Sequence, residues 1–165
     1  MVSVKSMKID GQDIHIFNSA IYIYESSNGQ TLQLDVIVSE VVLKKYKDEE
    51  SLIIGVELED GRIISSIMLL NTLPGGLPQL NLVCELDEQE YNEYDDFERV
   101  DENNAQFPNV EAGITLEEIR KVEMPNEKIN LKLTLPIDQV EWLKTQKTKD
   151  LNNLFKQLLY ELMKD

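Results

Sequence analysis

Residues 129–165 carry the most regular pattern in the chain, and it begins with a strand-like alternation. Every second residue of the first part is apolar: Ile129, Leu131, Leu133 and Leu135. The residues between them are Asn130, Lys132 and Thr134. This period of two predicts a strand with one buried face. Pro136 ends the strand because its nitrogen has no hydrogen to donate, and its fixed φ suits the start of a helix.

The last part of the chain has the period of a helix. Its apolar residues recur at intervals of three and four: Leu151, Leu154, Phe155, Leu158, Leu159, Leu162 and Met163. They form one continuous apolar stripe along a helix. Such a stripe has to be covered, either by the rest of the chain or by a second copy of it. The sequence leaves both arrangements open.

The first 90 residues alternate like an antiparallel sheet. Two short turns support hairpins, Asn28-Gly29 and Asp60-Gly61, each between alternating runs. Residues 41–50 are ambiguous, because they could extend a strand or form a short surface helix. We expect an α+β fold: an antiparallel β barrel or sandwich of about six or seven strands, then a short helix, a late strand and one or two C-terminal amphipathic helices.

Residues 85–102 change the character of the chain, because 10 of these 18 residues are Asp or Glu. The segment also carries aromatic residues, so it could dock a cationic partner. It could equally be a solvated face whose aromatics cover the sheet. The candidate partner-binding residues in this segment are Tyr91, Tyr94, Asp95, Asp96 and Phe97.

A capping box marks the next helix. Thr115 is followed three residues later by Glu118, which predicts a helix that starts at Leu116. Met124 and Pro125 end it after about two turns. We therefore expect an acidic β-rich domain over residues 1–125 and a strand-helix-helix element over 126–165. The sequence leaves open whether this element packs on the same domain.

Charge is unevenly spread along the chain. Residues 1–128 hold 26 acidic against 10 basic residues, a net charge of −16, whereas residues 129–165 hold 5 against 6. A body this acidic repels phosphate backbones and attracts basic protein surfaces. The single cysteine, Cys84, excludes an internal disulfide framework. With no signal peptide or membrane span expected, we predict a cytoplasmic protein.

Catalysis is not expected. The one histidine, His15, lies in an outward strand position, and Cys84 lies in the apolar phase of its strand, where a thiol behaves as a small hydrophobe. The acidic run lacks the spacing of a calcium-binding loop. We therefore expect no enzyme activity, no metal site and no cofactor.

From Ile129 onward the chain resembles the ribbon-helix-helix family of DNA-binding proteins. The likeness covers the alternating strand, Pro136, a first helix with Trp142-Leu143 and a second helix from Asp150 to Tyr160. It implies a dimer whose paired strands enter the major groove of DNA. The residues facing the bases would be Asn130, Lys132 and Thr134. Asp150 would cap the second helix, whose N–H groups could face a phosphate.

Two functions follow as hypotheses. The first is a non-catalytic acidic cytoplasmic protein that binds another macromolecule, as an inhibitor, adaptor or chaperone-like protein. Its partner would be a protein with a basic surface, bound through the acidic aromatic segment or the C-terminal helix, where Trp142 could need a second surface. The alternative is a dimeric DNA-binding regulator with an N-terminal β domain.

Overall fold

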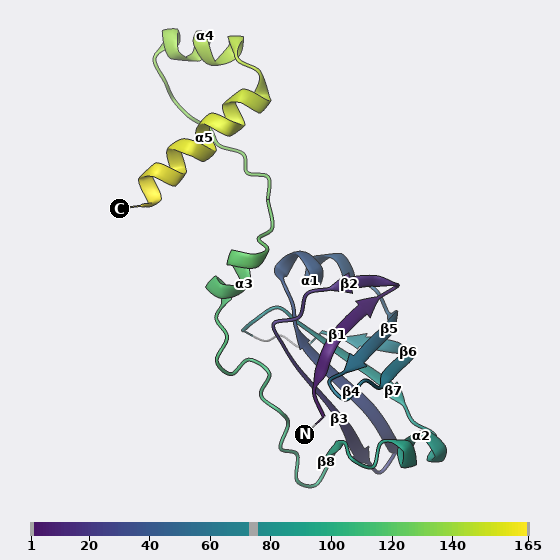
Figure 1. Ribbon diagram of the computed structural model, residues 1–165. Coiled ribbons are helices and arrows are strands. Elements are labelled where there is room, and N and C mark those ends of the chain that lie inside the picture. The colour runs from purple at the N-terminus through teal and green to yellow at the C-terminus, as the bar shows by residue number, and fades with distance from the viewer. Residues whose placement is uncertain (1, 73–75, 165) are drawn as a thin grey trace. The chain divides into compact units, whose positions relative to one another are not determined.

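The computed structural model describes residues 2–72 and 76–164, and its chain divides into two compact units, residues 1–126 and 127–165 (Figure 1). Among the helices of these described residues, none has the length and apolarity needed to cross a membrane.

Within its described residues, the first unit forms a sheet and three short helices (Figure 1). The strands are β1 (Val4–Ile9), β2 (Gln12–Ile14), β3 (Asn18–Ser26), β4 (Gly29–Ile37), β5 (Ser51–Leu58), β6 (Ile63–Asn71), β7 (Gln79–Glu85) and β8 (Glu98–Asp101). The helices are α1 (Glu40–Tyr46), α2 (Glu88–Glu93) and α3 (Leu116–Val122). The ambiguous residues 41–50 therefore contain a helix, α1.

The eight strands make one open sheet in the order β2-β1-β5-β6-β7-β4-β3-β8. All neighbours are antiparallel except β3 and β8, which are parallel. The α+β class is confirmed, but a closed barrel is wrong, because the first and last strands of the order do not pair. These edge strands have only three and four residues, which limits the backbone edge open to other chains.

Turn residues explain the hairpins. Asp10 and Gly11, between β1 and β2, have φ values of 50° and 81°, the left-handed region that tight hairpins need. Gly29 and Gly61 also have positive φ, at the two turns expected from the sequence. The register Ser26↔Gly29 closes the hairpin of β3 and β4 around two residues.

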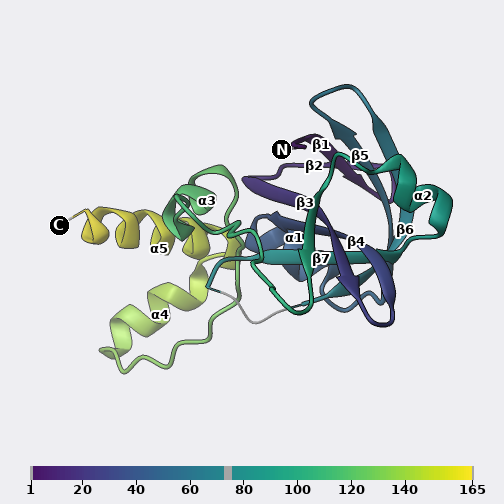
Figure 2. The same ribbon diagram turned by 90° about the horizontal axis from the view of Figure 1, so that it is seen from below.

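The main core lies inside the curl of the sheet, and Figure 2 shows the strands bending around this common interior. Alternating residues of six strands fill it, among them Ile9, Ile23, Leu34, Ile54 and Leu82, all fully buried. The hydrophobic effect of this burial stabilises the unit. The face of the sheet turned away from this core is called the outer face below.

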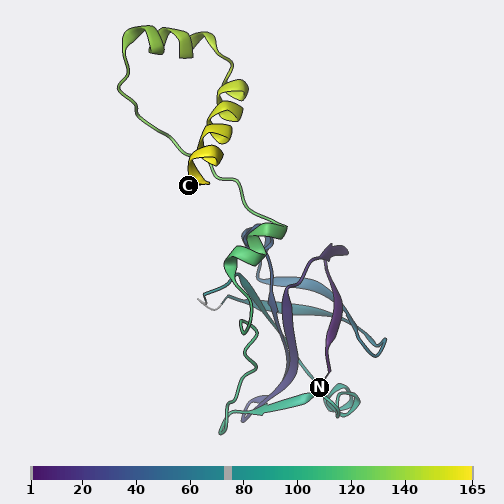
Figure 3. The same ribbon diagram turned by 60° about the vertical axis from the view of Figure 1, so that its left-hand side comes forward.

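A second, smaller core lies on the outer face, where the segment after β8 runs along the sheet to α3 (Figure 3). Ile37 of β4, Val110 and Ile119 of α3 are buried together there. The predicted capping box is confirmed, since the Thr115 side chain accepts from the Glu118 N–H. Thus α3 begins where the sequence indicates and presses Ile119 onto the sheet.

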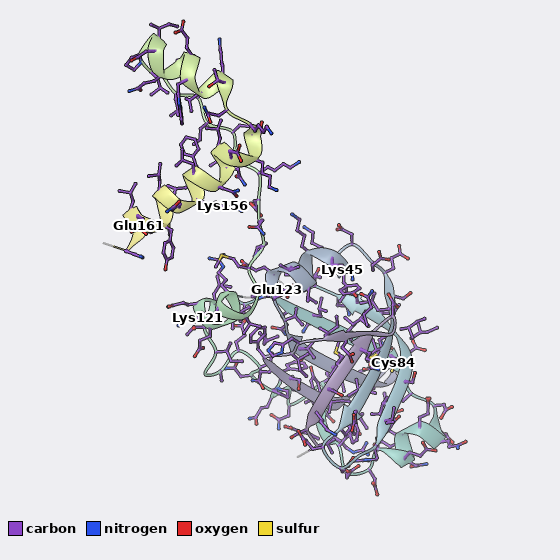
Figure 4. All side chains as sticks on the ribbon, turned by 45° about the horizontal axis from the view of Figure 1, so that its top comes forward. Lys45, Cys84, Lys121, Glu123, Lys156 and Glu161 are labelled. Carbon is purple, nitrogen blue, oxygen red and sulfur yellow. The ribbon has the colours of Figure 1, made fainter. Side chains whose placement is uncertain are left out.

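Polar contacts fasten α3 to α1. Arg120 donates two hydrogen bonds of 2.8 Å to the Glu40 carboxylate. The Ser39 hydroxyl, which caps α1, donates to Glu123 at 2.6 Å. Figure 4 shows Glu123 at the end of α3 beside α1, with Lys121 exposed on α3. These contacts hold the whole segment from β8 to α3 against the sheet.

The second unit contains α4 (Ile137–Thr145) and α5 (Thr148–Met163). Both expected C-terminal helices are therefore present. The late strand expected over residues 129–135 is not formed within the described residues of this single chain. A strand needs a neighbour to satisfy its backbone groups, and none of the eight strands pairs with this segment.

Candidate functional site

The acidic segment is fixed to the sheet by its first aromatic residue. The Tyr91 hydroxyl donates to Glu25 on β3 at 2.6 Å, and Arg99 of β8 donates to the same carboxylate at 2.8 Å. The Arg99 guanidinium also lies over the Tyr91 ring, 4.2 Å from its centroid. The hydrogen bonds from Tyr91 and Arg99 lower the pKa of Glu25. The hydroxyl and the ring of Tyr91 therefore both have contacts within the first unit.

The other aromatics of this segment cover the core. Phe97 is only 3% exposed and packs against Tyr94 with ring centroids 4.8 Å apart. Arg62 lies over the Phe97 ring and donates to both oxygens of Asp96, at 3.0 and 2.6 Å. Hydrogen bonding to Arg62 lowers the pKa of Asp96. Phe97 therefore offers no surface to a partner, whereas Asp95 remains exposed.

The second unit presents its apolar residues to the outside. No side chain within its described residues, 127–164, is buried. Leu133 is 59% exposed, and Ile129 and Leu131 are more exposed still. The helical stripe predicted for α5 is also open, since Leu154, Phe155, Leu158, Leu159, Leu162 and Met163 are all exposed.

The second unit contains an apolar groove, and Leu133 and Phe155 are two of the side chains that line it. The groove has a volume of about 470 Å³. Its apolar lining comes from the extended segment and both helices: Leu133, Leu135, Trp142, Leu143 and Phe155. Trp142, singled out from the sequence, is therefore part of this groove and more than half exposed. The apolar side chains around the groove are therefore not fully covered by other residues of the unit.

The polar side of the extended segment is also exposed, and it holds the three candidate DNA-binding residues Asn130, Lys132 and Thr134. Asp150 lies in the first turn of α5, whereas the N-cap is Lys147, without a side-chain hydrogen bond. The expected Asp150 cap is therefore wrong. Gln146 and Lys147 join the helices with negative φ, at −88° and −74°, so this turn needs no glycine.

The sequence did not indicate a buried polar cluster on the outer face of β3, β4 and β7. Tyr22 donates from its hydroxyl to one oxygen of Asp35 at 2.9 Å, and the Asn81 amide donates to the other at 2.7 Å. Burial and the nearby carboxylate raise the pKa of Tyr22. Asp35 lies in the polar phase of its strand, which is typical of a solvated face. Only the pairing of Asp35 with Asn81 across β4 and β7 reveals the cluster.

Two residues with side chains suited to nucleophilic or acid–base catalysis are His15 and Cys84. His15 is exposed, with its ring edge-on to Phe17 at 4.7 Å. Cys84 lies on β7 within the sheet domain (Figure 4), and burial raises the pKa of its thiol. A raised pKa leaves little thiolate, which is the nucleophilic form. Across residues 2–72 and 76–164, no group of three or more His, Cys, Asp or Glu side chains is placed to hold a metal ion.

The chain was compared with models of protein families, with curated proteins and with solved structures. None of the three comparisons finds a match.

Proposed function

We propose that the chain is a non-catalytic cytoplasmic regulator that forms a homodimer through residues 127–164 and binds DNA with the paired extended segments. The observation that carries this proposal is that no apolar residue among the described residues of the second unit is buried and that most of them are exposed. The resemblance to ribbon-helix-helix proteins, together with helices at 137–145 and 148–163, supports it. The β-rich unit would then serve sensing or assembly.

A second copy of the chain is the partner that best fits the second unit. A polypeptide of fewer than about 40 residues rarely buries enough surface to fold alone. The extended segment has an apolar face and a free backbone edge, and a twin segment would satisfy both at once. Two copies would also close the apolar groove with the α5 stripe. The late strand of the sequence prediction would form in this dimer.

The DNA-contacting surface would be the polar side of the same segment. Amide and cationic side chains suit hydrogen bonding to base edges in the major groove. Lys128, Asn130 and Lys132 lie on this polar side, and two copies would double them. The second unit has a net charge of +1, with seven Lys against six acidic residues. DNA would therefore meet this unit rather than the acidic one.

The first test is the solution mass of the full chain by light scattering across a hundredfold range of concentration. The proposal expects a dimer of about twice the 19.0 kDa chain mass. A monomer at every concentration would overturn it, because a two-stranded ribbon needs two chains. The same sample is then used to select binding sites from random DNA duplexes. No enrichment with a proven dimer would reject DNA as the ligand.

Lys132→Ala is expected to weaken binding to the selected DNA at least tenfold. A lost base contact costs about 1–3 kcal/mol, and the dimer would lose two. The dimer and the fold should be unchanged, because Lys132 is exposed and makes no ion pair within the described residues. Fluorescence anisotropy with labelled DNA measures the change. Lys156→Ala, which removes the same charge from α5, is the matched control, and equal losses would contradict a specific role for Lys132.

A second candidate, binding to a basic protein, is favoured by an apolar surface patch. Ile53, Ile63, Ile67 and Leu69 are exposed on the outer face of β5 and β6, and Ile53 lies directly opposite Ile67. Contiguous exposed apolar side chains in an acidic surface are typical of protein-binding sites. Ile67→Lys should then abolish partner binding in a pull-down assay without changing thermal stability. Undiminished binding would exclude the patch as the interface.

A further inference from the structure

The outer face of the first unit carries a pocket that the proposed function does not use. This outer pocket has a volume of about 730 Å³, within the range of small-molecule sites. Its floor is the cluster of Tyr22, Asp35 and Asn81, and Phe107 and Pro108 of the segment after β8 form one wall. All of these residues belong to the first unit, so the pocket is complete without the second.

The carboxylate of Asp35 on the pocket floor can accept more hydrogen bonds than it receives. Asp35 is only 7% exposed, and its two hydrogen bonds come from the neutral donors Tyr22 and Asn81. An ionised carboxylate can accept about four hydrogen bonds. None of the ion pairs within residues 2–72 and 76–164 includes Asp35. Buried charges in proteins are normally paired, so this carboxylate is suited to an external cation.

Asn81 holds the Asp35 carboxylate in place from the neighbouring strand β7. Its side chain is only 5% exposed, and the nitrogen is used by Asp35. Its Oδ1 is buried and has no hydrogen-bond donor among the described residues. A buried acceptor without a donor is destabilising, and such atoms are few in native proteins. The Asn81 Oδ1 is closed to the pocket, so the acceptor that remains for a ligand is the Asp35 carboxylate.

The wall beside this floor is aromatic. Phe107 stacks on Tyr24 with ring centroids 5.8 Å apart and approaches Tyr22 edge-on at 6.2 Å. Although held by these contacts, Phe107 is still 55% exposed. An aromatic face next to a carboxylate attracts organic cations, because the ring quadrupole and the negative charge act in the same direction.

We propose that the outer pocket binds a small organic cation whose ammonium or guanidinium group is held by Asp35 and whose carbon chain lies along Phe107. An ammonium group carries three donors and a guanidinium five, which supplies the floor with what it lacks. This inference goes beyond the proposed function and does not depend on dimerisation or DNA.

The test is calorimetric titration of the full chain, in about physiological salt, with three probes: agmatine, 2-phenylethylamine and its uncharged analogue 2-phenylethanol. We expect at least one of the two amines to bind with a dissociation constant below 1 mM and the alcohol to bind at least tenfold more weakly. Failure of both amines to bind would overturn the proposal. So would an alcohol that binds as tightly as the amine.

Three variants separate the pocket from the general acidity of the chain. Asp35→Asn keeps the size of the side chain and should weaken amine binding at least tenfold. Phe107→Ala should weaken it several-fold, and it removes an exposed ring, so it protects the test if Asp35→Asn fails to fold. Asp13→Asn makes the same charge change on exposed β2 and should have no effect. Equal binding by the Phe107 variant and the wild type, or equal losses for Asp13 and Asp35, would refute the site.

Discussion

Leu133→Asp is expected to dissociate the proposed homodimer while leaving the first unit folded. Leu133 is exposed in the single chain and lines the apolar groove with Trp142. Burying one leucine contributes about 1.5–3 kcal/mol, so a dimer that loses two is weakened by about 3–6 kcal/mol. This corresponds to an increase in the dissociation constant on the order of a hundredfold to ten-thousandfold. Burial of the new carboxylates would add to the loss.

The single tryptophan makes this prediction measurable in one sample. Trp142 lies in the second unit, so its emission should shift to longer wavelength when the dimer dissociates. The thermal transition of the first unit, followed by circular dichroism of its sheet, should stay where it is. If the variant is still dimeric at the concentrations at which the wild type is dimeric, residues 129–135 are not the interface.

Thr134→Asp is the matched control for this experiment. It adds the same charge one residue along, on the polar side of the extended segment. Dimerisation should be unchanged within about 0.5 kcal/mol, as is usual for exposed substitutions. Binding to selected DNA should nevertheless be lost, because the new negative charge would enter the major groove of a polyanion. The pair of variants therefore separates self-association from DNA binding.

Local signals in the sequence predicted the local structure well. Asn28-Gly29 and Asp60-Gly61 mark hairpins, and Thr115 with Glu118 marks the start of α3. Each depends on residues a few positions apart. The parallel pairing of β3 with β8 was not predicted, because Glu98 to Asp101 lacks a regular apolar alternation. The open order of the sheet depends on long-range pairing, which local patterns do not encode.

The same distinction explains what was predicted of the candidate sites. The apolar stripe of α5 and the alternation before Pro136 are periodic, so the sequence indicated both faces of the second unit. Tyr91 and Phe97 were visible as aromatics, but their contacts are with Glu25 and Arg62, far away in the chain. Asp35 carried no signal, because a polar residue in an alternating strand is expected to face solvent. Its contacts come from Tyr22 and Asn81 on the neighbouring strands, which local patterns do not encode.

Ile119→Ala is expected to lower the stability of the first unit and to loosen the segment that packs on its outer face. Ile119 is fully buried against Ile37 and Val110. Truncating a buried isoleucine to alanine costs about 2–5 kcal/mol, out of a total of about 5–15 kcal/mol for a typical domain. Urea unfolding followed by circular dichroism measures the shift of the midpoint.

The loss should be accompanied by local opening of the segment between β8 and α3. The Asn18 amide donates to the Val110 carbonyl at 2.8 Å, and this contact depends on α3 staying in place. Ile119→Ala is therefore expected to speed hydrogen exchange, relative to the wild type, more at residues 103–119 than at β4 and β7. Val122→Ala, in the same helix but at an exposed position, is the control and should cost less than about 0.5 kcal/mol. Equal effects of the two substitutions would mean that the smaller core around Ile119 contributes little to stability. That core would then not be what holds Phe107 in the wall of the outer pocket.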